Sequence, residues 1–144
     1  KGVRLLAIGD TGRLPERTRK LLERSIEQTA GNTKINLVLA LSYGSRAEIA
    51  GAARKIAQKI SAGELRPDAI TEETFGQYLD TAGMPDPDLL IRTSGEMRIS
   101  NFLLWQISYA ELYLTDTLWP DFSEQDMEAA VKDYARRTRR FGGI

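Results

Sequence analysis

The sequence predicts an α/β fold in which a mainly parallel sheet is flanked by helices on both faces. Short apolar runs alternate along the chain with longer stretches whose apolar residues recur at helical spacing. This alternation is typical of parallel sheets whose strands are joined by helices. The run from Ile35 to Leu41 is almost continuously apolar, as expected for a strand that is covered on both faces.

In the first half of the chain, turn and cap residues define the expected elements. Pro15 suits a first helical turn, and Gly31 suits a helix end. The expected elements are a strand at 3–8, a helix from 15 to about 31, a strand at 35–41, a helix at 46–61 and a short helix from 71 to about 80. Asp10 follows the first strand, and we interpret it as a turn residue between strand and helix.

The second half continues the alternation after a loop rich in glycine and proline. It predicts a brief strand at 89–91, a polar loop at 92–100, a short apolar helix at 101–109, a strand at 112–114 and a final helix at 123–140. We expect residues 1–144 to form one domain. The chain begins directly with an apolar strand, without an initiator methionine, so we expect this domain to be incomplete at its N-terminus.

Composition excludes several classes of function. The 144 residues carry a formal net charge of zero, which argues against nucleic-acid binding. Cysteine and histidine are both absent, so thiol chemistry, serine–histidine hydrolysis and imidazole metal sites are excluded within the chain. A metal would need oxygen ligands, which favours Mg²⁺. No apolar run approaches a membrane span and no signal peptide is visible, so we expect a cytoplasmic location.

The polar loop after the strand at 89–91 is a candidate anion site. Arg92 and Arg98 flank a glycine-containing turn, and Ser100 stands at the expected start of a helix. Arginine matches phosphate oxygens, and a helix N-terminus exposes free N–H groups. Arg92 could instead pair with Glu96 or Asp88 and only brace the turn, and Ser100 could be a simple N-cap. No glycine-rich nucleotide loop is present.

One long motif resembles a known family. Residues 88–106 read DLLIRTSGEMRISNFLLWQ, and the pattern continues through YAEL at 109–112 to WPDF at 119–122. This string is similar to the last signature region of the cis-prenyltransferases, which include the undecaprenyl diphosphate synthases. The segment SYGSR at 42–46 is similar to the NYGGR-type segment of the family, with Ser42 and Ser45 in place of its usual Asn and Gly.

The resemblance implies an enzyme that condenses isopentenyl diphosphate onto an allylic diphosphate, with farnesyl diphosphate the expected partner substrate. The product would be a long cis-polyprenyl diphosphate such as undecaprenyl diphosphate. The resemblance further implies that Arg92, Arg98 and Ser100 bind isopentenyl diphosphate, with the backbone of Ile99 between them. It implies Mg²⁺ as cofactor and Glu111 as its ligand. Read without the family, Glu111 is a solvated carboxylate.

The family also implies a homodimer with possible peripheral association with a membrane. Arg140 and Gly142 match a terminal Arg-x-Gly element that reaches the active site of the dimer partner. A charged terminal helix is otherwise a solvated face. The family's catalytic aspartate is expected in a segment before Lys1, so the catalytic residue is unknown here and we expect the 144-residue chain alone to be inactive.

Two other functions are alternatives to this one. A non-catalytic accessory subunit of the same fold would have little reason to keep the arginine loop and Glu111. A nucleotide-binding α/β domain is the second, and binding of nucleotide instead of isopentenyl diphosphate would favour it. The length of the product is not predicted.

Overall fold

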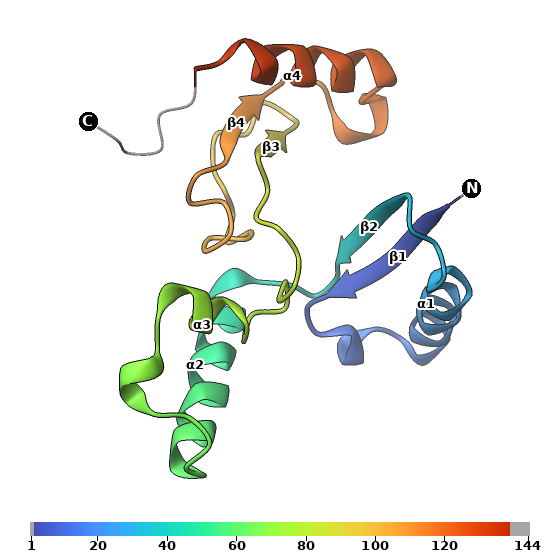
Figure 1. The fold of residues 1–144 in the computed structure, drawn as a ribbon. Helices are drawn as coiled ribbons and strands as arrows, with labels where there is room; N and C mark the ends of the chain where they lie inside the picture. The colour runs from blue at the N-terminus through green and yellow to red at the C-terminus, as the bar shows by residue number, and fades with distance from the viewer. Residues whose placement is uncertain (1, 139–144) are drawn as a thin grey trace. The chain divides into compact units, whose positions relative to one another are not determined.

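The computed structural model describes residues 2–138, which divide between residues 84 and 85 into two compact units. Each unit contains one pair of parallel strands, so the predicted α/β class and the parallel pairing are confirmed. Figure 1 labels the elements of both units. None of the helices within residues 2–138 is both long and apolar enough to cross a membrane.

In the first unit, the parallel pair is built around one helical crossover. Strand β1 (Val3–Ile8) pairs with β2 (Ile35–Ala40), with Val3 opposite Ile35 and Ile8 opposite Ala40. Helix α1 (Glu16–Thr29) connects them and lies against β1 (Figure 1). The Thr29 hydroxyl accepts a hydrogen bond from the Leu5 N–H at 3.0 Å, which fixes the end of the helix to the strand.

Two further helices complete the first unit. Helix α2 (Ser45–Ser61) buries Ala52 and Ile56 on one face, as its helical spacing predicts. Helix α3 (Glu72–Gly76) contacts α2 and begins where the Thr71 side chain accepts a hydrogen bond from the Thr74 N–H. It ends at Gly76 and not near residue 80, because turns follow it. Short 3-10 turns lie at Thr11–Arg13 and Pro67–Ala69.

One expectation for the first unit is not met. The apolar run of β2 predicts burial on both faces, yet Ile35 and Leu37 are 60% and 51% exposed. Only its later residues, Val38 to Ala40, are partly buried. An apolar run therefore gives the position of this strand correctly, but within the described residues its first half is not covered.

In the second unit, a parallel pair is followed by a helix. Strand β3 (Leu89–Arg92) pairs with β4 (Glu111–Leu114), with Leu89 opposite Glu111 and Arg92 opposite Leu114. A 3-10 turn at Trp119–Asp121 leads to helix α4 (Glu124–Arg136), which lies against β4 (Figure 1). A capping box between Ser123 and Asp126 starts this helix.

Two expected helices of the second unit are wrong in extent or in kind. Residues 101–109 form successive turns and not a helix, because Asn101 and Leu103 adopt left-handed φ values of 63° and 46°. Such φ values are incompatible with a right-handed helix. Helix α4 ends at Arg136, so the expected helix to residue 140 is too long.

Candidate functional site

The predicted anion loop lies where β3 and β4 both end. Ser94 and Gly95 donate backbone hydrogen bonds of 2.9 and 3.0 Å to the carbonyls of Thr117 and Thr115. Gly95 has a φ of 65° and suits this turn because it carries no side chain. The loop after one strand is thus fastened to the segment after its neighbour, at the edge of a parallel sheet where ligands usually bind.

Within this loop, one glutamate holds two arginines. Glu96 forms an ion pair with Arg98, and its carboxylate lies 3.9 Å from Arg92 Nη2. The side chains of Arg92 and Glu96 are 35% and 30% exposed, whereas that of Arg98 is 71% exposed. The structure therefore brings together the two predicted anion-binding arginines, and it also shows the pairing of Arg92 with Glu96 that would brace the turn.

Arg92 still has hydrogen-bonding capacity in this arrangement. Its Nε atom is buried and has no hydrogen-bond partner among the described residues. A buried donor without a partner is unfavourable by about 1–3 kcal/mol, so a ligand oxygen at this position would be stabilising. The guanidinium is thus only partly satisfied by Glu96.

Ser100 does not provide the helix N-terminus that was expected. Its φ of 54° is left-handed, the residues that follow it form turns, and the nearest backbone bond is from Phe102 N–H to the Ile99 carbonyl at 3.3 Å. The argument from helix N–H groups and the helix dipole is therefore wrong for this loop. Ser100 is an exposed residue, so a ligand can approach it.

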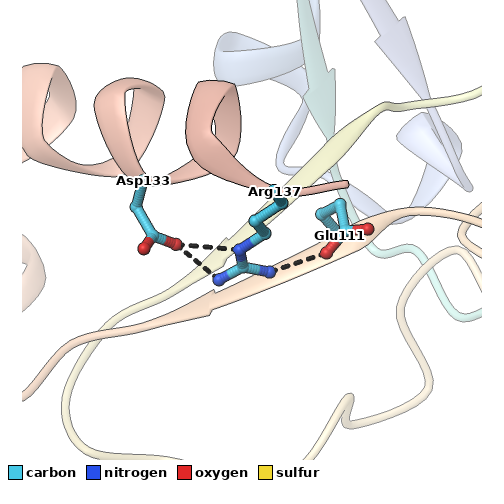
Figure 2. Close-up of polar contacts among 3 residues, drawn as sticks. All are labelled: Glu111, Asp133 and Arg137. Atoms are coloured by element: carbon cyan, nitrogen blue, oxygen red, sulfur yellow. Dashed lines mark hydrogen bonds and ion pairs between the residues drawn. The ribbon is translucent and has the colours of Figure 1, made fainter. Parts of the chain in front are cut away.

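Glu111 is engaged in an ion pair and is not a solvated carboxylate. Its Oε2 atom accepts a hydrogen bond of 2.8 Å from Arg137 Nη1, and its side chain is 27% exposed. Arg137 also donates from Nε and Nη2 to Oδ2 of Asp133, at 2.9 and 2.5 Å. Figure 2 shows the guanidinium between the two carboxylates. The hydrogen bond to Glu111, and then that to Asp133, raise the pKa of Arg137.

The arginine loop and Glu111 occupy opposite ends of the strand pair. Arg92 lies opposite Leu114 and ends β3, whereas Glu111 lies opposite Leu89 and begins β4. Three residues along a strand correspond to about 10 Å. The structure therefore groups Arg92 with Arg98 but does not place Glu111 beside the backbone of Arg92.

No complete metal site is formed by the residues described. Within residues 2–138, no three or more acidic side chains are grouped so that they could hold a metal ion. Glu111 Oε1 has no protein partner in that part of the chain, so one carboxylate oxygen is available to a cation. Arg140 and Gly142 lie outside the described residues.

A cavity of about 220 Å³ lies at the ends of β1 and β2. Its buried Glu48 accepts hydrogen bonds from the Tyr43 hydroxyl at 2.5 Å and from the Asp80 N–H at 2.9 Å. Asp80 in turn accepts one from the Gly9 N–H. Asp10 also lines the cavity, and it directly precedes the 3-10 turn, as predicted for a turn residue.

Arg137 and Asp133 are the site residues that reasoning from the sequence missed. Asp133 and Arg137 are four residues apart, and this spacing alone predicts an ion pair on one face of a helix. The partnership of Arg137 with Glu111 spans 26 residues, so no local pattern indicates it. The double pairing of Glu96 was missed in part, since only Arg92 was considered as its partner.

Comparisons with known proteins agree with the resemblance in the motif. Residues 1–142 match the family model described as "Putative undecaprenyl diphosphate synthase". The chain is 55% identical to an isoprenyl transferase of Porphyromonas gingivalis, over 97% of this chain and 55% of the relative. It is 53% identical to an isoprenyl transferase of Geobacillus kaustophilus, over 100% of this chain and 56% of the relative. The chain thus spans about half the length of these curated relatives.

Two solved structures are similar in fold. A lavandulyl diphosphate synthase from Lavandula x intermedia, in complex with dimethylallyl diphosphate, matches with a TM-score of 0.95 and 45% identity, over 98% of this chain and 61% of that one. A "probable undecaprenyl diphosphate synthase" from Campylobacter jejuni matches with a TM-score of 0.84 and 38% identity, over 99% of this chain and 64% of that one.

Proposed function

The chain belongs to the undecaprenyl diphosphate synthase family of prenyltransferases, and from this we propose that it provides the isopentenyl diphosphate site of a cis-prenyl chain-elongating enzyme. The observation that carries the proposal is the pair of arginines around Glu96, in the loop that follows β3. The family motif and the clustered positive charge coincide at this loop. Ser100 and Ile99 are proposed to contact the same substrate.

Charge and unsatisfied donors suit this loop to a diphosphate. Arg92, Arg98 and Glu96 together leave one net positive charge, and Arg92 Nε is a buried donor without a partner. Guanidinium groups form paired, charge-assisted hydrogen bonds with phosphate oxygens. A diphosphate would replace Glu96 as the partner of both arginines, and Glu96 would then be released to solvent.

Mg²⁺ is proposed as the cofactor, with Glu111 as a protein ligand. Magnesium is usually held by one or two carboxylates together with substrate phosphates and water, rather than by a cage of protein ligands. A single glutamate with one oxygen unengaged fits a site of that kind. When bound, the ion would neutralise charge on the diphosphate groups. Arg140 and Gly142 stay proposed substrate-binding residues on the strength of the motif alone.

In the proposed reaction, the protein mainly positions substrates and stabilises charge. The bond between the allylic carbon and its diphosphate breaks, the double bond of isopentenyl diphosphate attacks that carbon, and a proton is then lost. Arg92 and Arg98 hold the diphosphate of the attacking substrate and so fix the position of its double bond. The catalytic aspartate is expected outside this chain. Because the chain matches only about half of each relative, we propose that prenyl transfer needs the remaining part as well.

The identity of the substrates is proposed at two levels of detail. A structural neighbour was solved with dimethylallyl diphosphate, which supports an allylic diphosphate as the second substrate. Farnesyl diphosphate is proposed from the family resemblance. The two neighbours are named for different products, so their similar folds do not select the product, and undecaprenyl diphosphate stays a proposal.

Assembly and location are proposed from the same resemblance. We propose a homodimer with peripheral membrane association and a cytoplasmic location. One family model covers residues 1–142, which supports treating both compact units as parts of one prenyltransferase domain.

The test is incorporation of labelled isopentenyl diphosphate by the complete natural protein, with farnesyl diphosphate as acceptor. Arg92→Ala and Arg98→Ala should raise the KM for isopentenyl diphosphate about ten- to a hundredfold, as expected for the loss of a charge-assisted hydrogen bond of roughly 1.5–3 kcal/mol. The lysine variants should recover only part of this loss. An unchanged KM in both alanine variants would refute the proposed site, and binding of ATP in place of isopentenyl diphosphate would favour a nucleotide-binding domain.

A further inference from the structure

Glu111 already has a positively charged partner in the folded chain. Arg137 Nη1 lies 2.8 Å from Glu111 Oε2, and both side chains are about one-third exposed or less. The Arg137 guanidinium therefore occupies one of the two carboxylate oxygens of Glu111 that a cation would use. A divalent ion that approaches Glu111 meets the charge of Arg137 as well as that of the carboxylate.

The orientation of Arg137 is fixed from its own helix end. Two of its nitrogens donate to Asp133 Oδ2, one turn earlier in α4, which leaves Nη1 for Glu111 (Figure 2). Glu111, Arg137 and Asp133 carry a net charge of minus one as a group. Asp133 thus offsets part of the positive charge that Arg137 presents to Glu111.

From this arrangement we propose that Arg137 is a built-in counter-ion that competes with a divalent cation for Glu111, and that Asp133 limits this competition. The inference rests on the proposed role of Glu111 as a Mg²⁺ ligand. When the cation binds, Arg137 loses its hydrogen bond to Glu111 and keeps those to Asp133. Arg137 and Asp133 are accordingly positioning residues that set the affinity of the site, and neither is a metal ligand.

The C-terminal end of α4 has a second attachment that does not use Arg137. The Tyr134 hydroxyl donates to Asp88 Oδ1 at 3.1 Å, and the backbone of Asp88 accepts a hydrogen bond from the Glu111 N–H at 2.9 Å. Substitution of Arg137 therefore leaves α4 tied to the start of β3. Thermal unfolding followed by circular dichroism verifies that each variant is folded at the temperature of the binding measurement.

The experiment measures the dissociation constant for Mn²⁺ by electron paramagnetic resonance, without and with inorganic pyrophosphate, on the complete natural protein at low ionic strength. Arg137→Gln changes the charge of the group to minus two and should tighten binding on the order of tenfold, because one charge interacts with a divalent ion at short range. Asp133→Asn changes that charge to zero and should weaken binding by a similar factor. Arg137→Lys keeps the charge and should remain close to wild type.

Lys132→Gln is the matched control, since it removes one positive charge from α4, the helix that Arg137 caps, at an exposed pair with Glu128. It should change the dissociation constant less than about twofold, because separated exposed charges are screened by solvent and salt. Equal or weaker Mn²⁺ binding in Arg137→Gln would overturn the inference. Tighter binding in Arg137→Lys would equally show that charge is not the cause.

Glu111→Gln distinguishes this inference from the proposed function. If Glu111→Gln binds Mn²⁺ as wild type does, or if the wild-type protein binds none at millimolar concentration even with inorganic pyrophosphate present, the metal role of Glu111 is refuted and the inference with it. If Glu111→Gln weakens binding while Arg137→Gln does not strengthen it, the metal role stands and only the counter-ion role is refuted.

Discussion

Replacement of Glu96 by glutamine should tighten diphosphate binding, although Glu96 contacts no ligand in the proposed complex. In the folded chain its carboxylate is shared by Arg92 and Arg98. A diphosphate must displace it, and its negative charge also repels the incoming phosphates. Glu96→Gln keeps the shape of the side chain and removes both effects.

The size of the effect follows from exposure and distance. The pair with Arg98 is 71% exposed on the arginine side, and the contact with Arg92 is long, at 3.9 Å. Partly exposed pairs of this kind contribute about 0.2–1 kcal/mol each. Release of both arginines should therefore lower the dissociation constant about two- to thirtyfold, since roughly 1.4 kcal/mol corresponds to a factor of ten.

Isothermal titration calorimetry with isopentenyl diphosphate measures this constant directly. Glu128→Gln is the matched control, because it removes the same charge from the exposed pair with Lys132 in α4. The gain should appear only in Glu96→Gln and should shrink at high salt. Weaker binding in Glu96→Gln than in wild type would show that Glu96 shapes the loop for the ligand, and the competition argument would be wrong.

Three further predictions concern the fold that carries the site. Gly9→Ala should destabilise the protein by more than about 3 kcal/mol in urea unfolding. Gly9 has a φ of 92°, and a Cβ added there would lie 2.3 Å from the Leu41 carbonyl oxygen. In the control variant Gly63→Ala, the residue has a φ of 72° but open space around it, so the loss of stability should be only about 1 kcal/mol. Ser123→Ala should lower stability by about 1 kcal/mol in the same assay, because it removes the N-cap of α4. The hydrogen bond from the Ser123 side chain, and then that from its backbone, lower the pKa of Asp126. The ionised carboxylate therefore stabilises the fold at pH values above about 4, the usual pKa of an aspartate. This contribution is lost as the pH falls through the pKa of Asp126 in the folded protein. The stability difference between wild type and Asp126→Asn should accordingly shrink as the pH falls below about 4, and a difference that stays constant or grows in acid would contradict this assignment.

The sequence predicted the elements whose signals are local. Turn glycines, cap residues and runs of apolar residues correctly located the four strands and helices α1, α2 and α4, with errors at the boundaries. The helix expected at 101–109 failed because its apolar spacing is helical while Asn101 and Leu103 adopt left-handed φ values. Helix propensity and apolar periodicity are weak predictors of structure where turns of this kind redirect the backbone.

The sequence predicted the local part of the candidate site but not its contacts between distant residues. Arg92 and Arg98 follow a strand and flank a turn, so their convergence could be expected from the chain alone. Burial of Arg92 Nε and the pairing of Glu111 with Arg137 depend on tertiary packing across 26 residues, so no spacing rule reveals them. The role of Ser100 was placed on a helix that does not form.

Nuclear magnetic resonance of the arginine side chains tests the central claim most directly. The Nε–H signals of ¹⁵N-labelled protein, assigned with Arg92→Lys and Arg98→Lys, are followed during titration with isopentenyl diphosphate. Because Arg92 Nε is buried without a hydrogen-bond partner in the described structure, its signal should shift saturably as a phosphate oxygen becomes its acceptor, and that of Arg98 should shift with it. Unchanged Nε–H signals of both arginines at saturating isopentenyl diphosphate would contradict the claim that this loop binds the diphosphate.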